Sequence, residues 1–174
     1  MTAPASFPMD RALLGFLMQG AAHGYALHQR AEEELGRIWY MGMSNVYATL
    51  KELEGAGQVE VALDEEAYPP RKVYAITPAG RASFLAWIRE PVDAVRDMRV
   101  EFLAKLYFFH ALELEGALSL LRAQRGLCRE RLKELEPIAT DHPDDLFDRL
   151  VSEFRRRRLR SSIEWLRTCE KEWM

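Results

Sequence analysis

The sequence lacks the features of several protein classes. It contains only two cysteines, Cys128 and Cys169, in 174 residues, which argues against a disulfide framework and suits a reducing compartment. No apolar run approaches the length of a membrane span. The first residues do not follow the order of a signal peptide. We therefore expect a cytoplasmic protein without a membrane partner.

The chain also lacks the motifs of common enzymes. No GxSxG, HExxH, P-loop or GxGxxG pattern occurs. Its carboxylates lie on amphipathic helical patterns, where solvated acids are expected. His23 and His28 are five positions apart, a spacing that does not suit a zinc site on one helix. We therefore expect no enzyme activity, no catalytic residues, no cofactor and no metal site.

An excess of basic charge is missing as well. Residues 1–90 carry 8 Lys and Arg against 11 Asp and Glu, and residues 91–174 carry 16 of each. Domains that bind nucleic acid are often basic overall. Any DNA site in residues 1–90 must therefore be a local patch, with the acids placed on other faces.

The sequence does contain a helical pattern with clear ends at residues 41–57, MGMSNVYATLKELEGAG. Ser44 is a suitable N-cap, and Gly57 can adopt the left-handed turn that ends a helix. Apolar residues recur between them at helical spacing and predict one buried face. The other residues of the first turns are small, polar, aromatic and basic, which suits a helix that enters a DNA major groove.

Two shorter helices are predicted before this one. Asp10 can cap a helix over about residues 10–18, and a second helix is expected from about Gly24 to Leu35, with Tyr25 packed inward. The order of helix, helix, short link and helix is that of a helix-turn-helix module.

After this module the apolar residues recur at every second position, as in a strand. Residues 59–63 and 71–76 predict two strands, and residues 64–70, DEEAYPP, form the tip between them. Two strands that follow the third helix directly make a wing. Its basic pair, Arg71 and Lys72, either contacts phosphate or pairs with the acids of the tip.

A further helix is announced by Thr77-Pro78, since threonine caps helices and proline suits their first position. Beyond it the composition is that of long helices, expected over about residues 99–111, 113–135 and 143–172. Pro137 is expected to stop the second and Pro143 to start the third.

These long helices carry broad apolar faces that so small a subdomain cannot bury. Exchange of the helices across a two-fold axis would bury them, so we expect a homodimer. The run Arg155 to Arg158 surrounds its helix, because successive residues are about 100° apart. A second DNA contact and a solvated segment paired with nearby acids both explain it, and the second is favoured.

The predicted fold is therefore mainly α. Residues 1–9 form an N-terminal arm, residues 10–90 a winged helix-turn-helix domain with a two-stranded wing, and residues 91–174 a helical dimerisation domain.

Three segments, HGYAL, SNVYATLKELEGAGQV and PPRKVYAITPAG, occur in this order and at this spacing. Together they resemble the PadR family of transcriptional regulators over about residues 10–90. The C-terminal half is similar in length and helix pattern to the dimerisation domain of the longer branch, which includes virulence activators of the AphA type. The acidic tip of the wing departs from the family pattern and argues against strong wing contacts.

This resemblance implies a winged-helix homodimer that binds a palindromic double-stranded DNA operator and acts as a repressor. Some members release DNA when a small aromatic or hydrophobic compound binds, so such an effector is a further expected partner. The implied DNA-binding residues lie at the start of the second helix, on the third helix and in the wing. They are Gly24, Tyr25, Ser44, Asn45, Tyr47, Lys51, Arg71 and Lys72.

Two alternatives stay open at this point. Trp39, Trp87, Tyr107 and Phe108 either line an effector pocket or belong to the core, as large apolar residues usually do. The negative charge of residues 1–90 also suits a winged-helix adaptor that binds protein and no longer grips DNA.

Overall fold

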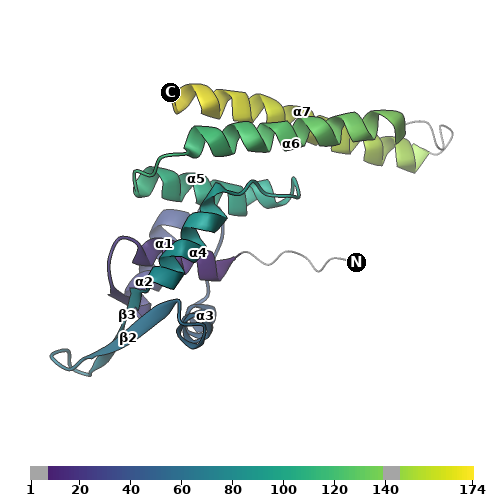
Figure 1. The fold of residues 1–174 in the computed structure, drawn as a ribbon. Helices are drawn as coiled ribbons and strands as arrows, with labels where there is room; N and C mark the ends of the chain where they lie inside the picture. The colour runs from purple at the N-terminus through teal and green to yellow at the C-terminus, as the bar shows by residue number, and fades with distance from the viewer. Residues whose placement is uncertain (1–7, 139–145) are drawn as a thin grey trace. The chain divides into compact units, whose positions relative to one another are not determined.

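The computed structural model of the chain describes residues 8–138 and 146–174 (Figure 1). No helix within these residues combines the length and the apolar character that crossing a bilayer requires. Of the described residues, those up to Glu90 and Arg99–Leu114 form the first compact unit, and Pro91–Met98 and those from Glu115 form the second. The elements in chain order are α1 (Met9–Leu17), β1 (Ala22–His23), α2 (Gly24–Leu35), α3 (Met43–Gly55), β2 (Val59–Asp64), β3 (Arg71–Ile76), α4 (Pro78–Arg89), the 3-10 helix η1 (Asp97–Arg99), α5 (Glu101–Ala111), α6 (Ala117–Ile138) and α7 (Leu146–Glu172).

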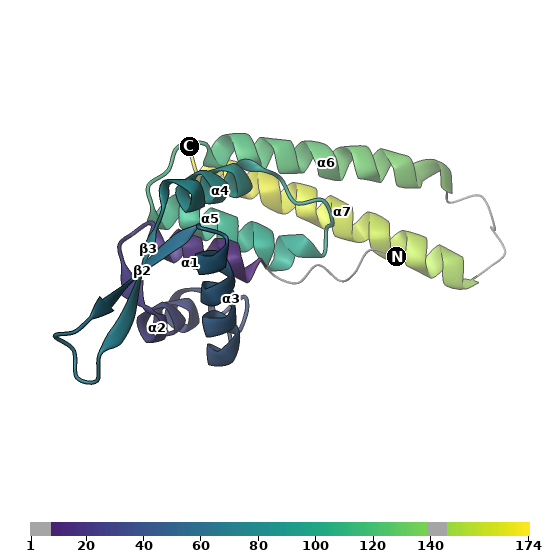
Figure 2. The ribbon, with the colours of Figure 1, turned by 60° about the horizontal axis from the view of Figure 1, so that its bottom comes forward.

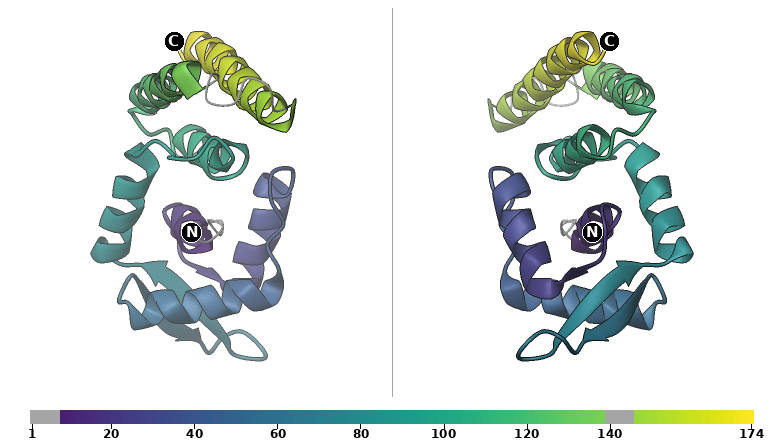
Figure 3. Two further views of the ribbon diagram at one scale, coloured as in Figure 1. Left: turned by 90° about the vertical axis from the view of Figure 1, so that its right-hand side faces the viewer. Right: turned by 90° about the vertical axis from the view of Figure 1, so that its left-hand side faces the viewer.

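Helix α1 forms the centre of the first unit. Six consecutive residues, from Ala12 to Leu17, are buried, and Figure 3 shows the helix nearly end-on with the other helices of the unit around it. It packs against α2, α3 and α4. A nine-residue helix that is buried on every side explains why apolar residues crowd this part of the sequence.

The buried faces of α2 and α3 complete a three-helix module. Leu27 and Leu35 of α2 are buried, as are Val46 and Leu50 of α3, at the three-to-four spacing that places side chains on one helix face. The predicted helix-turn-helix arrangement is therefore present. Most polar residues of α3 lie away from this buried face and stay exposed, whereas Thr49 is partly buried.

The sheet contains three antiparallel strands in the order β1-β3-β2. The predicted wing is β2 and β3, with Val61 opposite Tyr74, and it extends beyond the helices of the unit (Figure 2). The sequence did not predict β1, which pairs His23 with Val73. Two residues carry no detectable alternation, so this strand depends on a partner about fifty residues away.

Helix α4 begins as the sequence predicts. The hydroxyl of Thr77 accepts a hydrogen bond from the backbone N–H of Gly80 at 3.1 Å, and Pro78 occupies the first position. Gly80 is required here, since a Cβ would lie 2.1 Å from the carbonyl oxygen of Gln58. The TPAG motif therefore places α4 directly on the backbone that enters β2.

Helix α5 belongs to the first unit, although the expected boundary assigned it to the C-terminal domain. Phe108 packs edge-on against Phe16 and Phe84, with ring centroids 5.2 and 5.5 Å apart. A Cβ on Gly15 would lie 2.6 Å from the Phe108 ring, so α1 and α5 approach closely. This aromatic packing ties residues 99–114 to the winged-helix unit.

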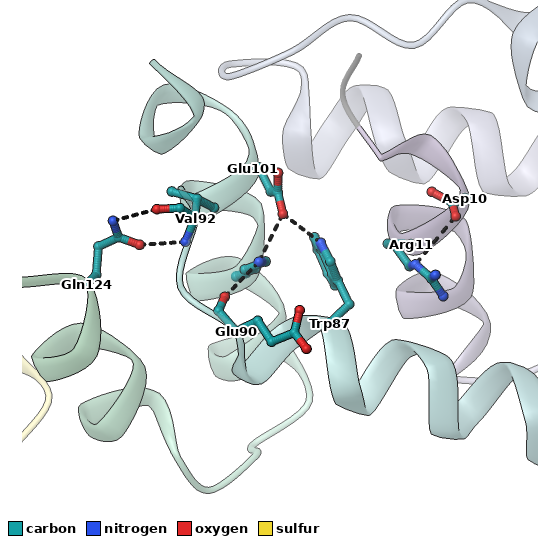
Figure 4. Close-up of polar contacts among 8 residues, drawn as sticks. Asp10, Arg11, Trp87, Glu90, Val92, Glu101 and Gln124 are labelled. Carbon is teal, nitrogen blue, oxygen red and sulfur yellow. Dashed lines mark hydrogen bonds and ion pairs between the residues drawn. The ribbon is translucent and has the colours of Figure 1, made fainter. Parts of the chain in front are cut away.

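A buried polar cluster joins α4 to α5 (Figure 4). Lys105 is only 2% exposed, and its Nζ donates to the Glu90 carbonyl at 2.8 Å and pairs with Glu101 Oε1 at 2.9 Å. The Trp87 indole donates to the same Glu101 oxygen at 2.8 Å. Burial lowers the pKa of Lys105, and the Glu101 carboxylate opposes that effect. The cluster satisfies the charges that α5 buries.

The second unit is a pair of antiparallel helices, α6 and α7, that pack side by side. Leu121 of α6 and Leu159, Ile163 and Leu166 of α7 are among its buried residues. The segment 91–98 is fastened to this pair by the buried Gln124, which accepts from Val92 N–H at 2.7 Å and donates to Val92 O at 3.0 Å (Figure 4).

Several predicted helix ends were wrong. Helix α3 starts at Met43, because Gly42 has the extended backbone of a cap residue, and Ser44 already lies inside the helix. Helix α1 starts at Met9, so Asp10 is in the first turn and pairs with Arg11 at 3.4 Å (Figure 4).

The predicted ends of α6 and the side-chain direction of Tyr25 also need correction. Positive φ angles at Glu113 and Gly116 delay the start of α6 to Ala117. The helix runs one residue past Pro137, where the proline removes only a last-turn hydrogen bond. Tyr25 is 51% exposed, because other residues of α2 occupy its buried face.

Two predictions fall mostly or wholly outside the described residues. They are the start of the last helix at Pro143 and the N-terminal arm over residues 1–9, of which the structure describes only residues 8 and 9. Met9 belongs to α1, and the described part of the last helix begins at Leu146.

Candidate nucleic-acid interface

A concave groove of about 720 Å³ lies where α2, α3 and the wing meet. It brings together side chains from positions more than forty residues apart in the sequence. Figure 2 shows α3 and the wing hairpin that flank it. Six of the eight predicted DNA-binding residues line this groove, namely Gly24, Tyr25, Tyr47, Lys51, Arg71 and Lys72.

The other two predicted residues, Ser44 and Asn45, lie beside the groove in the first turn of α3. Both are exposed. The cap residue, Gly42, has no side chain to accept from this turn. The N–H of Asn45 donates to the Gly42 carbonyl at 3.0 Å, which leaves the N–H groups before it for an outside acceptor. A helix start of this kind favours a phosphate or a base edge.

Tyr47 rests directly on Gly24. An ideal Cβ built on Gly24 would lie 2.6 Å from Tyr47 Cε1, which no real Cβ tolerates. The absence of a side chain at position 24 therefore allows the tyrosine ring to lie against the start of α2. Tyr47 stays 46% exposed, with one ring face supported by protein. The HGYAL and SNVY segments thus form one structural unit.

The basic pair of the wing has other partners than the tip acids. Arg71 Nη1 lies 3.5 Å from Nε2 of His23 on β1, and Lys72 Nζ lies 4.0 Å from a carboxylate oxygen of Glu54 on α3. Asp64 instead accepts hydrogen bonds from two backbone N–H groups of the tip, at 3.2 and 3.3 Å. The cations of the wing therefore face α2 and α3, where an anion could reach them.

Sequence reasoning missed four residues of the groove, and Tyr74 is the most informative of them. It is 5% exposed and forms part of the groove wall. Burial raises the pKa of its phenol, with smaller contributions from Glu54 and Tyr47. The sequence predicted only that this position lies in a strand. The missed residues are His23, Glu54, Pro70 and Tyr74.

The charge of the groove differs from that of the whole first unit. It holds the cations Lys51, Arg71 and Lys72 against one carboxylate, Glu54. Residues 1–90 have an overall excess of acids. The groove is therefore a local basic patch in a unit that is otherwise acidic, as a DNA site in this unit would need to be.

The aromatic residues predicted for an effector pocket do not lie together in the groove. Trp87 and Phe108 are buried in the first unit, and each contacts Phe84, with centroids 5.8 and 5.5 Å away. Trp39 and Tyr107 are half-buried. Residues 8–138 and 146–174 contain no group of three or more His, Cys, Asp or Glu side chains that could hold a metal ion.

The arginine run on α7 divides into two pairs. Arg156 and Arg157 contact the Glu153 carboxylate at 3.4 and 2.6 Å, and the Arg157 hydrogen bond is the main cause that lowers the pKa of Glu153. This matches the favoured solvated, ion-paired interpretation. Arg155 and Arg158 line a separate groove of the second unit.

Two family models match the chain. The model of the transcriptional regulator PadR-like family matches residues 13–86, and the model of the virulence activator alpha C-terminal domain matches residues 98–173. The first match contains α3 and the wing, and the second begins near α5.

Curated relatives share this assignment. The negative transcriptional regulator PadR of Bacillus subtilis is 27% identical over 126 residues, which are 72% of this chain and 69% of that protein. The probable transcriptional regulator Rv1176c of Mycobacterium tuberculosis is 33% identical over 92 residues, or 52% of this chain and 49% of that protein.

A solved structure supports the fold. The crystal structure of Bacillus subtilis PadR in complex with operator DNA matches with a TM-score of 0.50 at 23% identity, over 98% of this chain and 99% of that one. Together with the two family matches, this likeness agrees with the winged-helix elements described above. The chain therefore combines a PadR-like regulator domain over residues 13–86 with a C-terminal domain of the virulence activator alpha kind over residues 98–173.

Proposed function

We propose that the chain is a cytoplasmic, homodimeric repressor without catalytic activity that binds a palindromic DNA operator. The groove between α2, α3 and the wing is the observation that carries this proposal. It places three cations and a supported, exposed tyrosine on one surface of a winged-helix unit. The similarity to a negative transcriptional regulator supports repression as the direction of the effect.

The residues of the groove divide into two roles. Tyr47 and Lys51, with Asn45 in the first turn, are exposed on α3 and meet base edges in the major groove. Arg71 and Lys72 flank them from the wing and hold phosphate, which fixes the register of the helix on the duplex. Sequence selectivity therefore resides in α3, and salt-dependent affinity resides in both elements.

The dimer is argued from an exposed apolar stripe on α7. Leu146, Phe147, Leu150 and Phe154 are 59 to 70% exposed, and their spacing puts them on one side of the helix. Such a patch on a helix marks an interaction surface, and a second copy of the chain is the partner that a two-fold regulator requires. Two copies predict half-sites about one helical turn, roughly 10 base pairs, apart or a multiple of it.

Charge removal in the groove tests the DNA-binding surface. We expect Lys72→Ala and Arg71→Ala each to weaken operator binding and to reduce the slope of log affinity against log salt by about 0.9 for each lost phosphate contact. Arg37→Ala removes an exposed cation outside the groove and is the matched control. Fluorescence anisotropy over a salt series measures both quantities. Unchanged slopes for both groove variants would contradict this placement.

Release of DNA by a small aromatic or hydrophobic effector is part of the proposal. The half-buried Trp39 and Tyr107 are the aromatic residues of the expected set that retain accessible surface beside the core. Titration of planar aromatic compounds against tryptophan fluorescence tests this part. Quenching that is accompanied by release of operator DNA supports it, and no quenching across a varied panel assigns these residues to packing alone.

The adaptor alternative makes a different prediction. A winged-helix protein that binds only another protein has no DNA affinity for salt to reduce. The negative charge of residues 1–90 favours the adaptor, and the net positive groove favours the regulator. The salt series described above therefore discriminates between the two functions.

A further inference from the structure

The second unit contains a groove of its own, of about 370 Å³, between α6 and α7. Leu135 and Leu159 supply apolar walls from the two helices, and Val95 of the segment 91–98 adds a third. Small-molecule sites occupy roughly 300–1,000 Å³ and combine apolar walls with a few polar groups. Three guanidinium groups complete the lining, those of Arg131, Arg155 and Arg158.

These arginines are weakly engaged by the protein. Arg131 lies 3.8 Å from Asp93, but that carboxylate side chain is 96% exposed, so water competes strongly for it. No ion pair joins Arg155 or Arg158 to a carboxylate in the part of the chain that the structure describes, and the Arg158 guanidinium instead lies 5.7 Å from the Phe154 ring.

The neighbouring residues on the same helix behave differently. Arg156 and Arg157 are both held by Glu153. The four-residue run thus separates into one pair with an internal counter-ion and one pair that faces the groove. Among the described residues that line the groove, Glu134 is the one carboxylate, so this lining is net positive.

We propose that this groove binds an organic anion with an apolar body, such as a carboxylate that carries an aromatic or alkyl group. Guanidinium forks recognise carboxylates with two parallel hydrogen bonds, and the apolar walls contact the rest of the molecule. An apolar floor between the cations suits a free amphiphile better than a DNA backbone, which offers phosphates but no apolar group at that position.

The site also includes the segment that follows α4. Val95 belongs to residues 91–98, which Gln124 clasps to α6 through both polar groups of Val92, and Met98 contacts the buried Cys128, with sulfur atoms 3.9 Å apart. A bound anion therefore touches three separate segments of the second unit. Occupation of the groove slows amide hydrogen exchange in residues 91–98, because the ligand adds contacts to a segment that is otherwise held by α6.

Calorimetric titration of the full chain with two probes tests the site. The probes are 4-phenylbutanoate and 4-phenyl-1-butanol, which share one apolar body and differ in the charged head. We expect the acid to bind at least tenfold more tightly than the alcohol. The double variant Arg155→Gln, Arg158→Gln is expected to lower the affinity for the acid by about tenfold or more, because its hydrogen bonds to charged groups are lost. Arg160→Gln is the matched control, since it removes an exposed arginine of the same helix outside the groove.

The experiment has outcomes that support the proposal and outcomes that overturn it. A preference for the acid that disappears in the double variant but persists in Arg160→Gln supports the proposal, as does slower hydrogen exchange over residues 91–98 with the acid bound. Equal binding of acid and alcohol, no detectable binding of the acid at 10 mM (about −2.7 kcal/mol), or an unaffected double variant would overturn it. Operator binding that weakens in the double variant, while binding of the acid does not, would assign these arginines to DNA instead, and would also overturn it. Circular dichroism and sedimentation confirm that the variants keep fold and oligomeric state.

Discussion

At the scale of single residues, Gly24 and Tyr47 show how two separate sequence segments build one surface. The glycine lies in the first position of α2 and the tyrosine in the second turn of α3. Their contact leaves no room for a Cβ at position 24. The motif HGYAL therefore describes both a helix start and the surface on which a side chain of the next helix packs.

Substitution of this glycine tests that relation. We expect Gly24→Ala to push the Tyr47 ring away and to weaken operator binding by about tenfold, which corresponds to roughly 1.4 kcal/mol. Stability should change by less than about 1 kcal/mol, because the displaced ring is half-exposed and can move. Anisotropy and chemical denaturation measure the two effects.

Gly55→Ala is the control for this experiment. Gly55 also belongs to a helix of the module, but no atom lies within 4 Å of a Cβ built there. Alanine at this position should leave affinity unchanged and favour the helix slightly. Equal affinities for wild type, Gly24→Ala and Gly55→Ala would show that the position of Tyr47 does not matter for DNA binding.

At the scale of elements, the connection between α4 and α5 depends on a buried cation. Lys105 satisfies the Glu90 carbonyl and the Glu101 carboxylate, which also accepts from Trp87. Removal of one partner leaves the others without a counter-charge in a poorly solvated place. Lys105→Ala should therefore lower the free energy of unfolding by about 3 kcal/mol.

A second variant isolates the charge. Lys105→Met keeps most of the buried volume, so the stability that this variant loses reports the cost of the unpaired Glu101 carboxylate. Adding Glu101→Gln removes that charge and should restore part of the stability. Urea denaturation followed by far-ultraviolet circular dichroism measures all three. A loss below about 1 kcal/mol for Lys105→Ala would mean that water solvates this cluster.

The exposed stripe of α7 leads to a prediction about assembly. Leu150→Glu and Phe154→Glu place charge on residues that are 59% and 60% exposed in one copy. If these residues are buried in the dimer, each substitution removes about 1.5–3 kcal/mol of favourable apolar burial and shifts the protein toward monomer. Sedimentation over a concentration series measures this, with Arg160→Glu as a control on the same helix. A dimer that resists both substitutions would contradict the use of this face.

The sequence predicted elements best where local chemistry determines them. The cap at Thr77, the left-handed Gly57 and the strand alternation after it are local properties, and all three were found as expected. Strand β1 was missed because its two residues are ordered only by pairing with β3. The start of α3 was misplaced because Ser44 and Gly42 are both acceptable caps, and tertiary structure decides between them.

The candidate site shows the same division. Motif resemblance identified the residues of α3 and the wing that line the groove, whereas His23, Glu54 and Tyr74 entered it only through the fold. Neither the spacing of the histidines nor the charge count predicts that His23 on β1 lies beside Arg71. The aromatic residues proposed for an effector could not be told from core by composition, since both roles favour large apolar side chains.

At the scale of the whole molecule, the net charge is small but the charged residues are segregated. The chain has a net charge of −3, yet the groove of the first unit and the groove of the second unit are each lined by three cations and one carboxylate. Distribution therefore matters more than the total for the anions that the protein can bind. A regulator with an acidic exterior and local basic sites should discriminate against non-specific DNA at physiological salt.

The most direct test of the central claim is fluorescence anisotropy of the full chain. The titrations use DNA from upstream of its own gene and unrelated DNA, each at low and at physiological salt. A regulator that reads DNA through α3 and the wing should bind the upstream DNA tightly, lose affinity steeply with salt and prefer it to the unrelated DNA by at least about a thousandfold. Absence of binding to either DNA even at low salt would contradict the claim and would favour a protein-binding adaptor.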